Sequence, residues 1–125
     1  IRLAREVNTA KTKWVINKIK QEVVKFEKKK LRKPVVVCMG LTYKADIDDL
    51  RESPALEIFE SLKKSKLSVL AVEPNIREHK KLSITDTVDA LKQADILVFL
   101  VNHKEFSALT INGKIILDFC GINTK

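Results

Sequence analysis

Glycine is scarce in this chain of 125 residues, which contains only Gly40, Gly113 and Gly121. A dinucleotide-binding fingerprint of the form G-x-G-x-x-G and a phosphate-binding P-loop both need several glycines at close, fixed spacing. Neither spacing occurs in the sequence. These two nucleotide-binding motifs are therefore excluded, although a nucleotide held by other groups is not.

Cysteine is also rare: Cys38 lies inside an apolar run and Cys120 lies near the end of the chain. Two cysteines without a local pairing pattern are typical of a reducing compartment, so we expect free thiols and a cytoplasmic location. Neither histidine lies near a cysteine or a second histidine at the spacing of metal ligands, which predicts no metal site. No activating partner for Cys120 is evident, so we predict no cysteine nucleophile.

Long apolar runs are missing as well. No run reaches the roughly 18 residues that a membrane span requires, and no signal-peptide pattern is present, so we expect no membrane partner. The hydrophobic share of 45% and the charged share of 32% are typical of a single globular domain. Because the chain opens at Ile1 without an initiator methionine, we interpret it as a fragment of a longer protein.

Excess positive charge is confined to one end of the sequence. Residues 1–33 carry twelve basic and three acidic residues, a net of +9, whereas the remainder carries twelve basic and thirteen acidic residues, a net of −1. We interpret the excess as the solvated face of a lysine-rich helix. The alternative, a basic helix that binds nucleic acid, is disfavoured because Trp14 and Phe26 belong on or near the apolar stripe. We expect no nucleic-acid partner.

Residues 1–30 lack glycine and proline and predict a long amphipathic helix. Its apolar residues follow helical spacing in a stripe that rotates slightly: Leu3, Val7, Ala10, Trp14, Ile16, Ile19, Val23 and Phe26. Such a helix is longer than one small sheet can cover. We therefore expect part of it to pack on another subunit, giving a homodimer. A basic run at residues 28–33 favours the C-terminus of the helix, and Pro34 is expected to end it.

After residue 34 the pattern changes to apolar strands that alternate with helices. The predicted strands are Val35 to Met39, Leu67 to Val72, Ile96 to Val101 and Ile115 to Phe119, with Ile84 in a short additional strand. Ser53 and Asp86 are predicted helix N-caps, the first followed by a proline and the second by Asp89 three residues later. Nearly all-apolar strands indicate a parallel sheet covered on both faces. We predict an α/β fold: a Rossmann-like three-layer parallel sheet preceded by a long N-terminal helix.

Ligands of open parallel sheets bind beyond the carboxyl ends of the strands, which makes residues 41–53 the main candidate. This segment is long for a strand-to-helix connection. Lys44 and Arg51 suit a diphosphate, and Tyr43 suits a base or sugar. Alternatively, the two cations only pair with neighbouring carboxylates. His103 is expected near the same edge, more often as a polar edge residue than as a base.

The sequence of residues 40–55, G-L-T-Y-K-A-D-I-D-D-L-R-E-S-P-A, resembles the signature G-[LF]-[AT]-[FY]-K-x-x-x-D-D-x-R-E-S-P-A of the UDP-glucose/GDP-mannose dehydrogenase family. The match is long and ungapped. Residues 4–8 look like the end of the family's central helical region. Residues 72–75 and 100–106 look most like the branch of the family that acts on UDP-N-acetylmannosamine.

The resemblance implies an enzyme that oxidises the C6 alcohol of a UDP-sugar to a carboxylate with two NAD⁺, through a thioester on a cysteine. It implies that residues 1–33 end a central helical dimerisation region and that residues 34–125 form the UDP-sugar-binding domain. Lys44 then contacts the nucleotide-sugar, Tyr43 lines that site, and Arg51 reaches toward NAD held mainly by another domain. The family's catalytic cysteine, lysine and asparagine lie upstream, so this fragment alone is expected to be inactive.

One position departs from the family pattern. Many members place a basic residue, which contacts the nucleotide, two positions beyond the aspartate of the last strand. Here the aspartate is Asp118 and the matching position is Cys120. Either another cation such as Lys125 substitutes, or binding by the isolated domain is weak.

Overall fold

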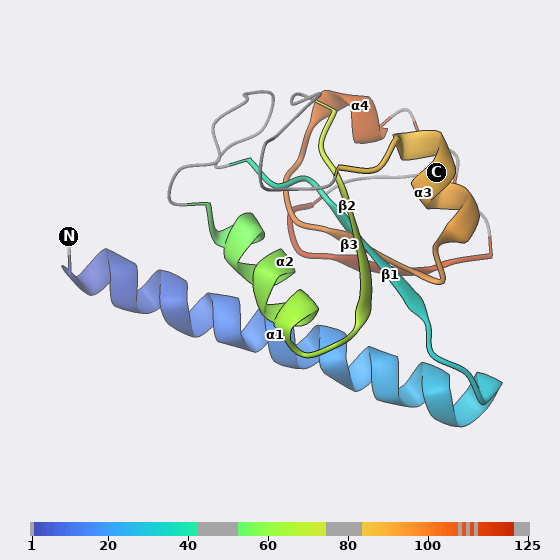
Figure 1. Cartoon of the computed structure of the whole chain (residues 1–125). Coiled ribbons are helices and arrows are strands. Elements are labelled where there is room, and N and C mark those ends of the chain that lie inside the picture. The colour runs from blue at the N-terminus through green and yellow to red at the C-terminus, as the bar shows by residue number, and fades with distance from the viewer. Residues whose placement is uncertain are drawn as a thin grey trace.

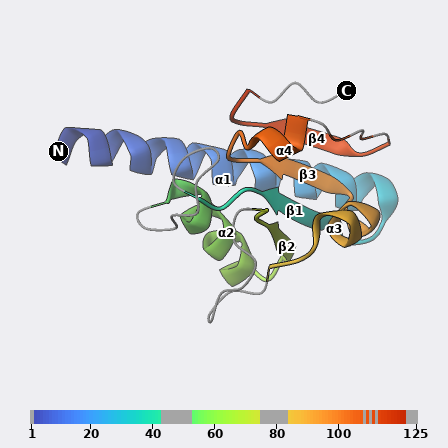
Figure 2. The same cartoon turned by 90° about the horizontal axis from the view of Figure 1, so that it is seen from above.

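The computed structural model describes residues 2–42, 53–74, 84–107, 109, 111 and 113–121, with the side chains of the first helix described from residue 10 onward. Within these residues the helices are α1 (Arg2–Lys30), α2 (Pro54–Lys64), α3 (Thr87–Gln93) and α4 (Lys104–Ser107). The strands are β1 (Val35–Met39), β2 (Ser68–Val72), β3 (Ile96–Phe99) and β4 (Ile115–Asp118) (Figure 1). All strand pairs are parallel, and the order across the sheet is β2-β1-β3-β4 (Figure 2).

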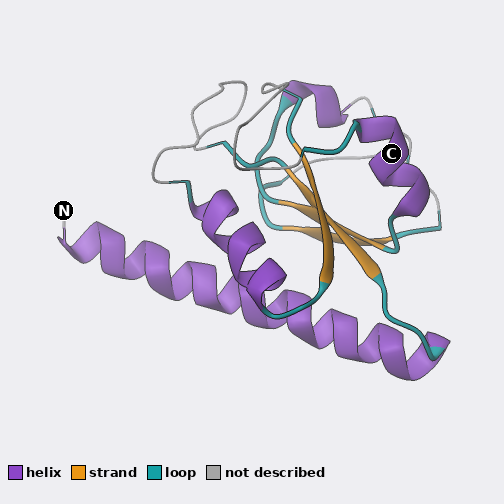
Figure 3. Ribbon diagram, viewed as in Figure 1, coloured by secondary structure: helices purple, strands orange, loops and turns teal. Residues whose placement is uncertain are grey.

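Helices cover both faces of the sheet, as predicted. Successive side chains of a strand point to opposite faces, so β1 contributes Val36 and Cys38 to one core and Val37 and Met39 to the other. The first core is closed by apolar residues of α1 and α2. The second is closed by residues of α3 and by Phe106 of α4. Figure 3 shows the helices lying on both sides of the strands. The expected three-layer α/β architecture is therefore confirmed.

Only part of α1 packs against this sheet, and its N-terminal turns extend past the sheet edge (Figures 1 and 2). The buried residues on α1 share one face and include Thr12, Val15, Ile19, Val23 and Phe26. Two residues from the first half of the predicted stripe lie outside this core, in the part of the helix expected to pack on another subunit. Ala10 is exposed, and the side chain of Trp14 is 52% exposed, with an edge contact to Phe119 and with Nζ of Lys18 5.6 Å from its ring centroid. The side chains of Leu3 and Val7 lie outside the described residues.

The C-terminus of α1 is set by backbone conformation rather than by proline. The helix ends at Lys30, and Leu31 adopts a left-handed conformation with φ 59°, from which its N–H donates to the carbonyl of Glu27 at 2.9 Å. Pro34 follows only after the chain has left the helix. The prediction that Pro34 ends the helix is therefore wrong, because the left-handed turn already redirects the chain.

An ion pair connects the segment just after α1 to the sheet. The Arg32 guanidinium donates to both carboxylate oxygens of Asp95, at 2.9 and 2.7 Å, just before β3 begins. Asp95 also accepts from the N–H of Val35 at 2.8 Å, at the first residue of β1. The planar guanidinium lies 4.9 Å from the ring centroid of Phe26. Asp95 thus connects the segment that follows α1 with the starts of β1 and β3.

The predicted helix starts are confirmed. The Ser53 hydroxyl accepts from the N–H of Leu56 at 3.3 Å to cap α2, and the Asp86 carboxylate accepts from the amides of Val88 and Asp89 to cap α3. Ile84 forms only an isolated parallel bridge to Ala71 rather than a strand. In the described part of the chain, no helix is long and apolar enough to cross a membrane.

Candidate functional site

The order of the strands places a topological switch point between the carboxyl ends of β1 and β3. The chain passes from β1 to β2 on one side and then returns to β3 on the other side of β1. The loops that follow β1 and β3 therefore leave the sheet in opposite directions, and this switch point is where open α/β sheets bind their ligands. Met39 and Phe99 are paired at this end of the two strands.

Gly40 allows the segment that follows β1 to approach the segment that follows β3 closely at the switch point. Its φ is +98°, a conformation that L side chains rarely adopt, and a Cβ at this position would lie 2.7 Å from Cβ of Val101. On either side, the N–H of Leu100 donates to the carbonyl of Met39 at 3.0 Å, and the N–H of Gly40 donates to the carbonyl of Val72 at 2.8 Å. The turn after β1 is thereby held against both neighbouring strands.

A buried carboxylate organises the next two residues of this turn. Oε1 of Glu73, which directly follows β2, accepts from the N–H of Leu41 at 2.8 Å and from the N–H of Thr42 at 3.2 Å. The same oxygen lies 2.9 Å from Nε2 of His103, which follows β3. Both side chains are 0% exposed. Because a carboxylate only accepts, His103 donates from Nε2 in this contact.

His103 completes a cluster that joins three strand ends. Its Nε2 also lies 3.1 Å from Oγ1 of Thr42, and its ring packs edge-on against Phe106 with the centroids 5.4 Å apart. The predicted location near the carboxyl edge is confirmed. Full burial means, however, that His103 presents no face to a ligand, so it is a structural partner of Glu73 rather than an exposed polar residue or a base.

Ser53 links the far end of segment 41–53 to its beginning. Its hydroxyl donates to the carbonyl of Leu41 at 2.6 Å while it accepts from Leu56, and the residue is buried. Residues 43–52 lie outside the described residues, including the predicted contacts Tyr43, Lys44 and Arg51. The structure therefore places the two flanks of the candidate loop together at the switch point.

Sequence reasoning missed Glu73 and the hydrogen-bonded pair that it forms with His103. Each residue lies just beyond the end of an apolar strand, and parallel strands bring such positions to one edge of the sheet. The signal was present in that spacing. The acid and the imidazole could be paired only once the strand order was known, because that order places β2 and β3 on either side of β1.

The two cysteines occupy different surroundings. Cys38 is fully buried in β1, where desolvation of the thiolate raises the pKa of its thiol to about 12, so it is unreactive at neutral pH. Cys120, just beyond β4, is partly buried against the second core, and its N–H donates to Oδ1 of Asp118 at 3.1 Å. These two cysteines, both among the described residues, do not form a disulfide. Lys125, the predicted substitute cation, lies outside the described residues.

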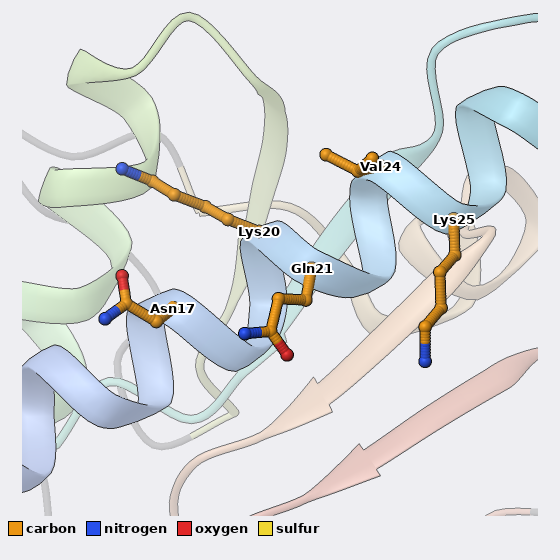
Figure 4. A pocket seen from close by; sticks show the side chains of 5 residues that line it. All are labelled: Asn17, Lys20, Gln21, Val24 and Lys25. Atoms are coloured by element: carbon orange, nitrogen blue, oxygen red, sulfur yellow. The ribbon is translucent and has the colours of Figure 1, made fainter.

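A shallow hollow on α1 is separate from the switch point. It is lined by Asn17, Lys20, Gln21, Val24 and Lys25, all of which are exposed residues of one helix (Figure 4). Ligand sites usually combine concave apolar walls with a few fixed polar groups. The solvated side chains of this hollow do not form such walls, and we assign no site to it.

An open parallel sheet with a polar cluster at its switch point defines the class of doubly wound α/β domains, which bind their ligands beyond the strand ends. Residues 37–125 match the model of the UDP-glucose/GDP-mannose dehydrogenase family, UDP binding domain. The chain belongs to this family.

Named relatives agree with this membership. The NDP-N-acetyl-D-galactosaminuronic acid dehydrogenase of Ralstonia nicotianae is 39% identical over 98% of this chain and 30% of its own length. The UDP-N-acetyl-D-mannosamine dehydrogenase of Escherichia coli is 43% identical over 90% of this chain and 29% of its own. The native structure of the UDP-N-acetyl-mannosamine dehydrogenase Cap5O from Staphylococcus aureus has a TM-score of 0.75 and 33% identity, covering 91% of this chain and 28% of that one. The chain thus spans about 30% of the length of its curated relatives.

Proposed function

We propose that this chain is the nucleotide-sugar-binding part of an NAD-dependent UDP-sugar 6-dehydrogenase. The proposed substrate is UDP-N-acetylmannosamine, oxidised by four electrons to the corresponding uronate; UDP-glucose and UDP-N-acetylglucosamine are the alternative sugars. The observation that carries the proposal is the location of the family signature. It begins at Gly40, at the switch point, within a match to the UDP binding domain.

Within this proposal, Lys44 binds the diphosphate, Tyr43 lines the sugar or base site, and Arg51 reaches toward NAD. A lysine ammonium and an arginine guanidinium both bind phosphate oxygens well. Support comes from the described residues that flank these three in sequence. Thr42 and Ser53 are both buried, and Leu41 is hydrogen-bonded to Ser53.

NAD itself does not fit the described turn. Its fingerprint needs several closely spaced glycines, whereas Gly40 is followed by the buried residues Leu41 and Thr42. In the proposed enzyme, NAD accepts hydride from the sugar and is held mainly by residues outside this chain. The 125 residues alone should therefore bind the UDP moiety without oxidising it.

Titration of the chain with UDP, followed by NMR, tests the proposal. We expect the amide signals of residues 44–51 to shift, and we expect Lys44→Met to weaken UDP binding about tenfold through loss of a charged phosphate contact. Lys64→Met, an exposed lysine at the end of α2, removes the same charge elsewhere and should leave binding unchanged. An unperturbed spectrum at millimolar UDP would contradict the proposal.

We also propose that the protein assembles as a homodimer through residues 1–33. Two observations support this. The N-terminal turns of α1 extend past the sheet (Figure 1), and Trp14 remains half-exposed although α1 already buries its other face in the core. Large apolar side chains that stay exposed on one side of a helix commonly mark association surfaces.

A further inference from the structure

One side-chain oxygen accepts three hydrogen bonds at the turn that leads into the candidate loop. Oε1 of Glu73 receives hydrogen bonds from two consecutive backbone amides, those of Leu41 and Thr42, and from the imidazole of His103. The three donors come from beyond β1 and β3, and the acceptor comes from beyond β2. The cluster thus ties together the carboxyl ends of three adjacent strands.

This arrangement is costly if its only role is to stabilise the core. Burying an ionisable pair costs desolvation energy, and well-packed apolar residues of similar volume often stabilise a protein equally well or better. The sheet beneath is already held by its own hydrogen-bonded pairs, such as Met39 with Phe99. What the cluster adds is a fixed position for two backbone amides that a strand ladder does not reach.

The residues that follow these amides are those assigned to the ligand. Thr42 directly precedes Tyr43 and Lys44, and Ser53 ties the other end of the segment back to Leu41 at 2.6 Å. A shift of the Leu41–Thr42 turn therefore displaces the start of the segment. Ligand contacts lose much of their strength when a charged group is misplaced by about 1 Å.

We infer that Glu73 and His103 are positioning residues for the UDP site: without touching the ligand, they fix the Leu41–Thr42 turn from which Lys44 reaches the diphosphate. The inference rests on the proposed function. Full burial excludes direct contact, since both side chains are 0% exposed. The pair acts through the backbone of the turn.

UDP affinity of substituted chains tests this role. His103→Phe preserves the ring that packs on Phe106 but deletes the donor to Glu73, and it should weaken UDP binding about tenfold and accelerate amide hydrogen exchange at Leu41 and Thr42. His103→Gln keeps a side-chain N–H donor and should recover part of the affinity. Ile19→Val is the control for a general loss of stability, because it removes a buried methylene from α1 in the first core, away from the cluster; it should lower the urea midpoint and leave UDP affinity unchanged.

The outcomes separate the two proposals. If the wild-type chain binds UDP and His103→Phe binds it equally well, or if Ile19→Val weakens binding as much, the positioning role is overturned while the proposed function stands. If the wild-type chain does not bind UDP, the proposed function fails and the positioning role fails with it. Should His103→Phe not fold, Glu73→Asp withdraws the shared acceptor oxygen from Leu41 and Thr42 by one methylene while it keeps the charge, and unchanged UDP affinity in that variant also overturns the inference.

Discussion

At the scale of single residues, Asp95 shows how one carboxylate can connect distant parts of the chain. It accepts from Arg32 at the end of α1 and from the N–H of Val35 at the start of β1. The hydrogen bond from the Arg32 side chain is the main reason that the pKa of Asp95 lies below its usual value. The carboxylate is thus more strongly favoured in the folded chain than in the unfolded one.

This lowered pKa predicts an acid-dependent contribution to stability. Because the folded pKa lies below the unfolded value of about 4, the contribution is fully present above pH 4 and is lost as pH falls through the folded pKa. Asp95→Asn should therefore be less stable than wild type at pH 7, with a difference that shrinks below pH 4. Urea unfolding from pH 7 to pH 3 measures it, with Glu60→Gln, exposed on α2, as the control. A difference that stays constant down to pH 3 contradicts the assignment.

Residue-level predictions succeeded where the signal is local. Ser53 and Asp86 were predicted as N-caps from residue type and from their immediate neighbours, and both accept the expected backbone amides. Glu73 and His103 are 30 residues apart in the chain, and their hydrogen bond follows from strand order. Local propensity carries no information about such a pair, which is why the sequence did not reveal it.

At the scale of elements, the end of α2 contains a left-handed lysine. Lys66 has φ 62°, its N–H donates to the carbonyl of Lys63 at 3.1 Å, and the next N–H, of Leu67, reaches the carbonyl of Leu62 at 3.5 Å. This is the hydrogen-bond pattern of a helix terminus that favours glycine. A lysine here adopts a conformation that is unfavourable for a side chain with a Cβ.

Lys66→Gly should therefore stabilise the chain by about 1 kcal/mol. Glu60→Gly, in the middle of the same helix, should instead lower the free energy of unfolding, because glycine in a helix interior costs about 1 kcal/mol. Thermal and urea unfolding of the two variants provide the comparison. Loss of stability in both would show that the Lys66 side chain makes contacts that outweigh the backbone effect.

The bounds of helices and strands were predictable where the hydrophobic pattern and the residue type changed at the same position. The first strand was predicted at its observed bounds because a β-branched run ends at a glycine. The four-residue helix α4 was missed, since it is too short to show periodicity. The helix over residues 1–30 was predicted with its observed end, but its termination was assigned to Pro34, because a left-handed leucine, Leu31, has no signature in residue type.

At the scale of the whole molecule, the fold class followed from apolar strands alternating with helices. The sequence did not reveal which face of α1 packs against the sheet, because apolar residues occur on more than one side of this helix. Val15 and Ile19 face the core, whereas Trp14 and Val24 are about half exposed. The positions of the predicted ligand contacts stay predictions, since Tyr43, Lys44 and Arg51 lie outside the described residues.

The exposed side of α1 leads to a prediction about assembly. Sedimentation should show a dimer whose dissociation constant rises about tenfold in Trp14→Lys, because a charge replaces an apolar contact. Val88→Lys makes the same kind of change at another exposed apolar residue, on α3, and should not alter association. A wild-type chain that remains monomeric at high concentration would rule out the homodimer.

The shared oxygen of Glu73 also constrains how this family can diverge. A mutation of the acid alone removes the shared acceptor of two backbone amides and an imidazole N–H, and a mutation of His103 alone leaves a buried carboxylate with one donor fewer. Neither single change is an easy evolutionary step. Across an alignment of relatives, positions 73 and 103 should therefore covary, with acid and imidazole retained together or replaced together.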